Sequence, residues 1–74
     1  MDDLIPFGYK LRNILKERKI SHVRFEMDTG IRRGILYATK HRHHRSTLMA
    51  IAYYLKMDVE ALVEDTDAMD DWYR

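Results

Sequence analysis

The chain has 74 residues and no cysteine, and its 13 Lys and Arg nearly balance 12 Asp and Glu, which gives a net charge of +1. This length allows one domain with one small core, and the lack of cysteine excludes a disulfide framework or a thiolate metal site. The acidic N-terminus does not resemble a signal peptide, and no apolar run approaches the roughly 20 residues of a membrane span. We therefore expect a cytoplasmic protein that makes no membrane contact.

The charges are unevenly distributed along the chain. Residues 1–56 hold 12 Lys and Arg against 5 Asp and Glu, whereas residues 57–74 hold 1 Arg against 7 acids. Between Ile31 and Arg45 there is no acidic residue. A basic region followed by an acidic one suits a protein that meets a polyanion with one face only.

The first predicted helix covers residues 7–19. Pro6 can occupy its first turn, where the missing N–H is not needed, and apolar residues then recur with helical spacing at Phe7, Leu11, Ile14 and Leu15. This stripe should face the core. The charged residues between these positions are read as a solvated outer face; they are Lys10, Arg12, Lys16, Arg18 and Lys19.

Two predicted helices joined by a single glycine come next. Ser21 has a hydroxyl that can cap a helix over residues 22–29. Gly30 tolerates the left-handed backbone that turns the chain out of this helix, and the following helix is predicted over residues 32–41. A helix, a glycine turn and a second helix with a basic first turn are the outline of a helix-turn-helix, in which the second helix enters the DNA major groove.

Arg32 and Arg33 open the second of these helices. They could simply face water, but the helix dipole disfavours cations at a helix start, so their placement makes more sense if an anion arrives there. Arginine is also the side chain that reads guanine O6 and N7. We predict that Arg32, Arg33 and, one turn further along, Tyr37 contact DNA bases, although a lone tyrosine could equally pack against the domain.

Five further residues are candidates for contacts with DNA phosphates. Ser21 and His22 lie at a helix start, where free backbone N–H groups attract anions, although Ser21 is equally explained as a plain cap. Lys40, Arg42 and Arg45 belong to a basic segment after the third predicted helix, for which a solvated loop is the other interpretation. Histidine protonation in this segment should strengthen DNA binding as the pH falls towards about 6.

The histidines of the same segment suggest a metal site as an alternative. His41, His43 and His44 could supply imidazole ligands. However, they share one short loop with arginines and have no cysteine or obvious carboxylate as a fourth ligand, which makes a poor structural zinc site. We predict that the protein holds no metal and no cofactor.

Two further helices complete the predicted domain. Ser46 can cap a helix over residues 47–55, whose apolar residues should form the centre of the core. Asp58 can cap a last helix over residues 59–64. The helix-turn-helix domain is thus expected to cover residues 1–63.

The remaining segment, residues 64–74, is acidic and carries Trp72 and Tyr73 close to its end. An acidic end of a chain can be frayed and solubilising. Large apolar rings are rare in disordered tails, however. The two rings could pack back on the domain, cross to a partner subunit or bind a partner protein.

Four separated segments carry a family resemblance. They are LRxxLKERKIS at 11–21, FxxDTGI at 25–31, IAxxL at 51–55 and DVEALV at 58–63. In this order they resemble the DNA-binding domains of phage Cro and repressor proteins and of the large related family of small bacterial regulators. The resemblance implies an all-α fold, a compact five-helix repressor-like helix-turn-helix domain that binds operator DNA, usually as a dimer.

The chain departs from the family pattern at several positions. His22 stands where glutamine is usual, and Glu26 stands where the two helices pack closely and alanine is usual. Gly34 lies inside the predicted recognition helix, which should cost about 1 kcal/mol relative to alanine. The loop at 41–45 also looks shorter than the family's usual connection.

Two functions from different classes fit these observations. The first is a sequence-specific DNA-binding transcriptional regulator of the Cro/repressor type, a homodimer that inserts helix 32–41 into the major groove of double-stranded DNA. The alternative is a protein-interaction module on a repressor-like fold that has lost operator recognition and binds a partner through its tail. We do not expect an enzyme, because the residues suggest no nucleophile–base pair, phosphate loop or paired carboxylates.

Overall fold

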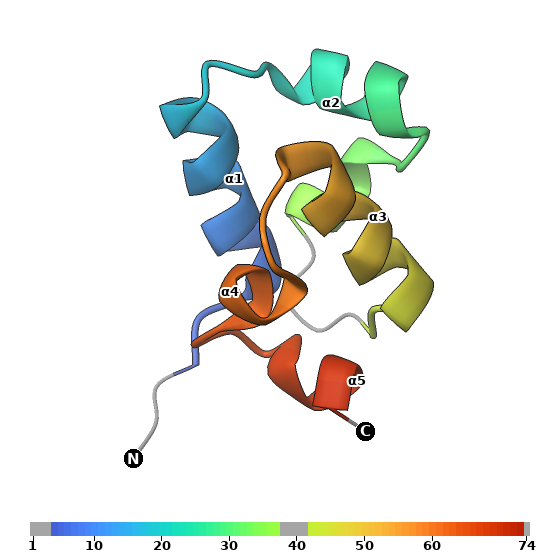
Figure 1. The fold of residues 1–74 in the computed structure, drawn as a ribbon. Coiled ribbons are helices and arrows are strands. Elements are labelled where there is room, and N and C mark those ends of the chain that lie inside the picture. The colour runs from blue at the N-terminus through green and yellow to red at the C-terminus, as the bar shows by residue number, and fades with distance from the viewer. Residues whose placement is uncertain (1–3, 38–41, 74) are drawn as a thin grey trace.

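The computed structural model describes residues 4–37 and 42–73, and this part of the chain is all-α, as predicted. Apart from one isolated β-bridge, its regular elements are all helical (Figure 1). They are five α-helices and one 3-10 helix: α1 (Phe7–Glu17), α2 (His22–Thr29), η1 (Arg33–Leu36), α3 (Arg45–Leu55), α4 (Val59–Val63) and α5 (Met69–Tyr73).

The core lies between α1 and α3. Figure 1 shows α2 across one end of this pair and α4 with α5 at the other end. Of the predicted stripe of α1, Phe7, Leu11 and Leu15 are fully buried and Ile14 is partly buried against the core. Each remaining α-helix except α5 adds at least one fully or almost fully buried apolar side chain. The large buried side chains are Phe7, Leu11, Leu15, Phe25, Leu36, Leu48, Ile51, Leu55, Leu62 and Val63.

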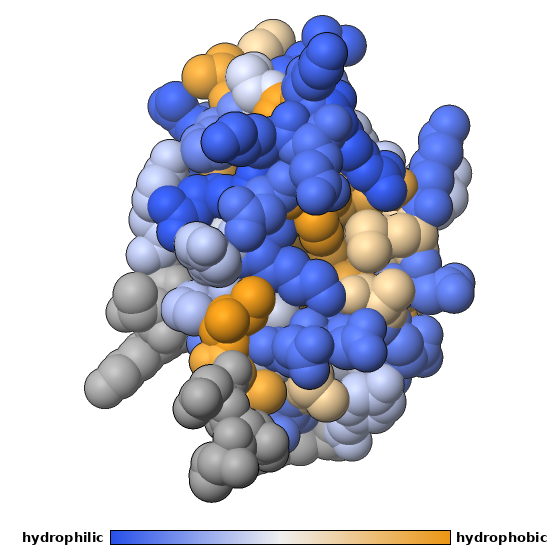
Figure 2. Space-filling view, turned by 90° about the vertical axis from the view of Figure 1, so that its left-hand side faces the viewer, coloured by the Kyte–Doolittle hydropathy of each residue, from blue (hydrophilic) through white to orange (hydrophobic). Residues whose placement is uncertain are grey.

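The opposite side of α1 is the solvated outer face that its charged residues predicted. This side of the molecule faces the viewer in Figure 2 and is mostly hydrophilic, with hydrophobic residues showing only in patches. Lys16, Arg18 and Lys19 are exposed. Lys10 and Arg12 depart from the prediction, because both are only partly exposed.

Gly8 brings the backbone of α1 against the backbone of η1. A Cβ atom at this position would lie 2.5 Å from the carbonyl oxygen of Leu36 and 2.8 Å from that of Ile35. Real Cβ atoms do not approach backbone atoms so closely, so only glycine fits between the two elements. This contact fixes the depth at which η1 sits on the domain.

Side chains from distant parts of the chain cap the helix ends near α4. The Oδ1 atom of Asp67 accepts the backbone N–H of Phe7 at 2.9 Å, at the start of α1. The ammonium group of Lys10 donates to the carbonyl oxygens of Ala61 and Glu64, at 2.6 and 2.9 Å, at the end of α4. Free N–H and C=O groups at helix ends need such partners, so these bonds join α1 to the C-terminal part of the fold.

A short backbone pairing lies beside these caps. Ile5 forms an isolated parallel bridge with Thr66. The N–H of Ile5 donates to the carbonyl oxygen of Asp65, and the N–H of Asp67 donates to that of Ile5, both at 3.0 Å. The residues before α1 and those before α5 are therefore held together.

The packing of the domain does not stop at residue 63, where the sequence suggested a boundary with an acidic tail. Thr66 and Ala68 are fully buried, and Trp72 packs against the core. Tyr73 is largely exposed. Of the arrangements considered for the tail, the described residues show packing back on the same domain, because the bridge and the Asp67 cap direct the chain there.

The helix predicted over residues 32–41 is the main difference from the sequence analysis. The described residues form only the 3-10 helix Arg33–Leu36, with Arg32 extended before it and Tyr37 at its end. The last four residues of the predicted helix lie outside the described part of the chain. Gly34 lies inside this turn and lowers the helix propensity, which favours a single tight turn here.

The remaining differences are at helix ends. The helix predicted from residue 47 begins at Arg45, so its N-cap is His44 and Ser46 lies inside the first turn. Asp58 precedes α4 as predicted, but its side chain makes no cap hydrogen bond. Helix boundaries depend on contacts made by the whole fold, and shifts of one or two residues are ordinary.

Replacing Asp67 with alanine should lower the free energy of unfolding by about 1 kcal/mol, the usual cost of losing a helix cap. The carboxylate accepts the Phe7 N–H at 2.9 Å, and no side chain of the residue before α1 does so. Urea denaturation measures the loss. Asp67→Asn keeps an oxygen acceptor and should stay close to wild type; equal losses in both variants would contradict the cap.

Candidate nucleic-acid interface

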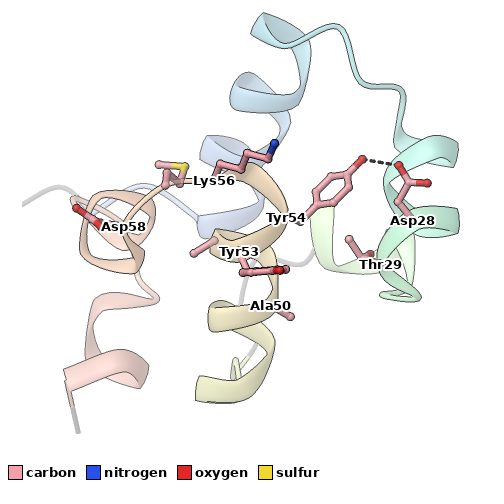
Figure 3. A pocket seen from close by; sticks show the side chains of 9 residues that line it. Asp28, Thr29, Ala50, Tyr53, Tyr54, Lys56 and Asp58 are labelled. Atoms are coloured by element: carbon pink, nitrogen blue, oxygen red, sulfur yellow. Dashed lines mark hydrogen bonds between the residues drawn. The ribbon is translucent and has the colours of Figure 1, made fainter.

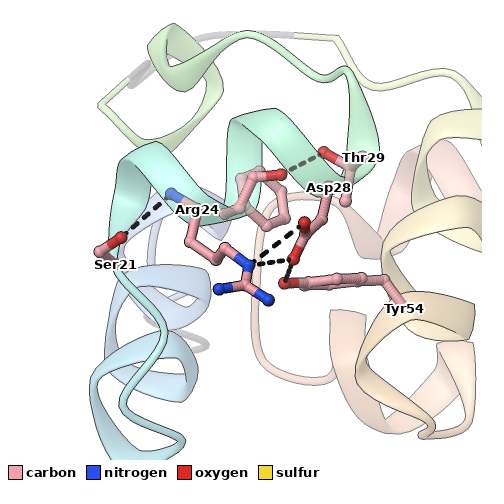
Figure 4. Close-up of polar contacts among 6 residues, drawn as sticks. Ser21, Arg24, Asp28, Thr29 and Tyr54 are labelled. Atoms are coloured by element: carbon pink, nitrogen blue, oxygen red, sulfur yellow. Dashed lines mark hydrogen bonds and ion pairs between the residues drawn. The ribbon is translucent and has the colours of Figure 1, made fainter.

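The first helix of the helix-turn-helix begins and ends as the sequence predicted. The Ser21 hydroxyl oxygen accepts the backbone N–H of Arg24 at 3.0 Å, which caps α2 (Figure 4). Gly30 ends α2 in the left-handed conformation with φ of 75°, and its N–H donates to the carbonyl oxygen of Glu26 at 2.8 Å. The turn that leads to η1 is therefore built from local signals.

Arg32 and Arg33, which the sequence predicts to contact bases, both lie exposed at the start of η1. Arg33 Nε is 2.8 Å from Oε1 of Glu26, and the Arg33 backbone N–H donates to Glu26 Oε2 at 3.4 Å. Glu26 therefore does not disturb the packing of the two helices. It reaches across the turn, places a negative charge at the start of η1 and holds the Arg33 side chain in one direction.

Tyr37 lies in a cluster of rings and one cation that joins three elements. Its hydroxyl is hydrogen-bonded to Nδ1 of His22 over 2.8 Å. The guanidinium carbon of Arg12 lies 5.0 Å from the centre of the Tyr37 ring and 5.7 Å from that of Tyr9. The Nε atom of Arg12 is buried and has no hydrogen-bond partner among residues 4–37 and 42–73. This side chain is thus an oriented cation beside the start of α2.

Sequence reasoning missed Arg12 and Tyr9 as members of this surface. Both belong to α1, and their neighbour Tyr37 lies at the end of η1, so no spacing within one helix shows the contact. The close approach at Gly8 was the signal available, since a glycine inside an amphipathic helix often marks a place where another backbone comes near.

The described arginines of the basic segment lie against α5. Arg42 Nε is 3.8 Å from Oδ1 of Asp71, and the Arg42 side chain is 77% exposed. The guanidinium carbon of Arg45 lies 4.5 Å from the centre of the Trp72 ring. Lys40, the third predicted phosphate contact of this segment, lies outside the described residues.

Comparison with known families decides what this arrangement is. A family model for the Cro/C1-type HTH DNA-binding domain matches residues 10–68. The chain belongs to this family. The match confirms the resemblance and the fold class predicted from the sequence. No curated protein and no solved structure gives a significant match to the chain.

The histidines of this Cro/C1-type domain do not gather in its described part. His43 is buried and its ring meets that of Phe7 edge-on, with centres 5.0 Å apart. His44 is exposed at the start of α3, and His41 lies outside the described residues. Over residues 4–37 and 42–73, no group of three His, Cys, Asp or Glu side chains could hold a metal ion.

An open groove of about 910 Å³ lies between α3 and the end of α2 (Figure 3). Inside it, the Tyr54 hydroxyl donates to Asp28 Oδ2 at 2.7 Å, and Arg24 Nε donates to the same oxygen at 3.0 Å (Figure 4). The hydrogen bond from Tyr54 is the main reason that the pKa of Asp28 lies below its usual value; burial opposes it and Arg24 adds to it. A carboxylate held ionised in this way is unsuited to general acid–base chemistry near neutral pH.

Lowering the pH should weaken the fold through Asp28, and Tyr54→Phe should reduce this effect. The folded-state pKa of Asp28 lies below an unfolded value of about 3.9, so its stabilisation is present above about pH 4 and lost as the pH falls through the folded value. Tyr54→Phe removes the main cause of the lowered pKa. Its free energy of unfolding, measured with urea, should therefore fall less than that of wild type between about pH 4 and pH 2.

Tyr53→Phe is the matched control for this experiment. Tyr53 lines the same groove and is 87% exposed, so its loss should leave the acid dependence unchanged. At alkaline pH the sign reverses: the bond to Asp28 raises the pKa of Tyr54, and its stabilisation is lost as the pH rises through a value above about 10. Equal acid dependence in Tyr54→Phe and wild type would contradict the account.

None of the described helices of this domain is long and apolar enough to cross a bilayer.

Proposed function

We propose that this Cro/C1-type domain is a sequence-specific DNA-binding transcriptional regulator that inserts η1 into the major groove of double-stranded DNA. The observation that carries the proposal is the pair of exposed arginines at the start of η1, directly after the helix-turn-helix turn. Arginine is the commonest side chain in specific contacts to guanine. The family match supports DNA as the ligand.

The two arginines differ in the interaction that each must give up before it can contact a base. Arg32 makes no ion pair with any described residue, so it can turn towards a base at little cost. Arg33 must exchange Glu26 for a guanine edge. Because both partners of that ion pair are partly exposed, it is worth about 1 kcal/mol or less, and a bidentate contact to guanine worth about 1–3 kcal/mol can replace it.

Phosphate contacts are proposed at the starts of two helices. At α2, His22 and Arg12 supply donors and a cation, and the Ser21 hydroxyl still has its own proton to donate while it accepts from Arg24. At α3, Arg42 and Arg45 supply two cations. Lys40 remains a prediction from the sequence.

A homodimer is the natural form of such a regulator. Two copies related by a two-fold axis would bind half-sites one helical turn, about 34 Å, apart. A bound dimer would act by blocking or recruiting other proteins at the same DNA, in the cytoplasm. Sedimentation of the protein with and without a two-half-site duplex measures the stoichiometry.

DNA binding measured by fluorescence anisotropy tests the function. The duplexes are fragments from upstream of the protein's own gene and scrambled fragments of equal length, each at two salt concentrations. The native fragment should bind at least about 10³-fold more tightly, the lower range for specific DNA-binding proteins. With Arg12, Arg42 and Arg45 on phosphates, log affinity should fall with log salt with a slope of about −3 per protomer. Equal, weak binding of both fragments would defeat the proposal.

The alternative, a protein-interaction module that binds through the tail, has less support from the structure. Trp72 packs against the core and under Arg45, which leaves Tyr73 as the exposed tail aromatic. A tight protein partner together with indifference to DNA would favour it.

A further inference from the structure

The start of α3 is a region of positive electrostatic potential, because it combines a helix N-terminus with two arginines. The helix has 11 residues with no acid in its first turn and no side-chain cap from His44. Arg42 precedes it and Arg45 opens it. Free N–H groups at the start of a helix, together with arginines, attract anions such as DNA phosphates.

An anion from the same chain already lies there. Asp71 Oδ2 accepts the backbone N–H of His43 at 2.9 Å, and its Oδ1 is 3.8 Å from Arg42 Nε. The Asp71 side chain is only 13% exposed, so its charge acts in a medium less screened than water. The next residue, Trp72, holds Arg45 over its ring at 4.5 Å.

These contacts come from a part of the chain outside the family match. The match ends at residue 68, whereas α5 begins at Met69. Asp71 and Trp72 thus lie outside the residues matched by the Cro/C1-type family model. They lie on the two arginines that we assign to phosphates.

We propose that Asp71 is an internal competitor of DNA phosphate at the start of α3 and lowers the DNA affinity of the domain. The inference rests on the proposed function, in which Arg42 and Arg45 contact phosphates. A phosphate near Arg42 must displace the carboxylate or tolerate its repulsion, and either costs affinity. Because the Arg42–Asp71 pair is long and Arg42 is exposed, the competition weakens binding without preventing it.

Asp71→Asn tests the competition because it removes the charge and keeps an oxygen acceptor for the His43 N–H. Asp70→Asn is the matched control: Asp70 is the adjacent residue of α5, is exposed and gives the same change in net charge. Asp71→Asn should bind the native and scrambled fragments about 5-fold more tightly than wild type, the effect of removing one partly exposed charge pair. Asp70→Asn should change binding less than about 2-fold, as expected of a screened charge.

A double-mutant cycle with Arg42→Ala distinguishes competition from a structural role. If Asp71 competes for Arg42, the gain from Asp71→Asn should largely disappear in the Arg42→Ala background. Asp71→Ser, which also lacks the charge, carries the same expectations if the asparagine variant does not fold.

The outcomes separate the inference from the proposed function. If wild type prefers the native fragment but Asp71→Asn binds no more tightly than Asp70→Asn, the inference fails and the function stands. Weaker binding by a folded Asp71→Asn also overturns it, since Asp71 would then position the segment for DNA. If neither wild type nor any variant binds either fragment, the function fails, and the inference fails with it.

Discussion

Gly8→Ala should destabilise the domain by about 3 kcal/mol or more, the upper range for overpacking a well-packed site. The new methyl group would meet the Leu36 carbonyl oxygen at 2.5 Å and its carbon at 2.7 Å. These are backbone atoms, which cannot move aside as the end of a side chain can, so α1 and η1 must separate. Thermal unfolding should show a midpoint lower by about 10 °C or more.

Gly34→Ala is the matched control for this substitution. A Cβ at Gly34 meets no atom of the described residues within 4 Å, and Gly34 does not adopt the left-handed conformation. Alanine should therefore be neutral or stabilise the domain by up to about 1 kcal/mol, since it restricts the unfolded chain more than glycine does. Similar losses in both variants would show that α1 and η1 do not touch at Gly8.

Arg33→Ala should reduce the preference for the native DNA fragment. The loss expected for that fragment is about 10- to 100-fold, the value of one bidentate contact to guanine, whereas the scrambled fragment should lose no more than about 5-fold, the value of one charge. The variant should still fold, because the Arg33–Glu26 pair is partly exposed and the buried residues of η1 are unchanged. Anisotropy with both fragments measures the two losses separately.

Arg24→Ala is the control for the removal of an arginine. Arg24 lies on α2, is exposed and pairs with Asp28 on the groove side, so its loss removes the same charge without touching η1. Arg24→Ala should lower the affinity for the native and the scrambled fragments by the same small factor. If Arg33→Ala behaves like Arg24→Ala, Arg33 does not read bases and the recognition surface must lie elsewhere.

Features that depend on neighbours in the sequence were predicted well. Ser21 caps α2, Gly30 ends it, and the stripe of α1 is buried at Phe7, Leu11 and Leu15. Each follows from helical periodicity or from the conformational freedom of one residue, so a short window of sequence contains the cause.

Features that depend on distant contacts could not be predicted. The Asp67 cap crosses 60 residues, and Arg12 is oriented by Tyr37 on another element. Glu26 stands at a position where the sequence analysis expects a small residue, and the sequence does not show that its carboxylate contacts Arg33 at the start of η1. No pattern within one helix contains these contacts.

The end of α3 and the segment predicted as a helix over 32–41 show the limits of propensity. Lys56 ends α3 in the left-handed conformation with φ of 57°, although glycine adopts this conformation with less strain. The backbone N–H of Met57 donates to the carbonyl oxygen of Ala52, and this hydrogen bond fixes the turn. The segment predicted as a helix over 32–41 has helical signals in its sequence. Gly34 and the hydrogen bond from the Arg33 N–H to Glu26 nevertheless favour a short 3-10 turn.

The bridge between Ile5 and Thr66 has a consequence for how the domain opens. Because the amides of Ile5 and Asp67 donate across the same pairing, one local unfolding event exposes both to solvent. Their hydrogen-exchange rates should therefore rise and fall together with denaturant, although 62 residues separate them in the sequence. Loosening α5 would then reach the start of α1, so the segments flanking the core behave as one cooperative unit.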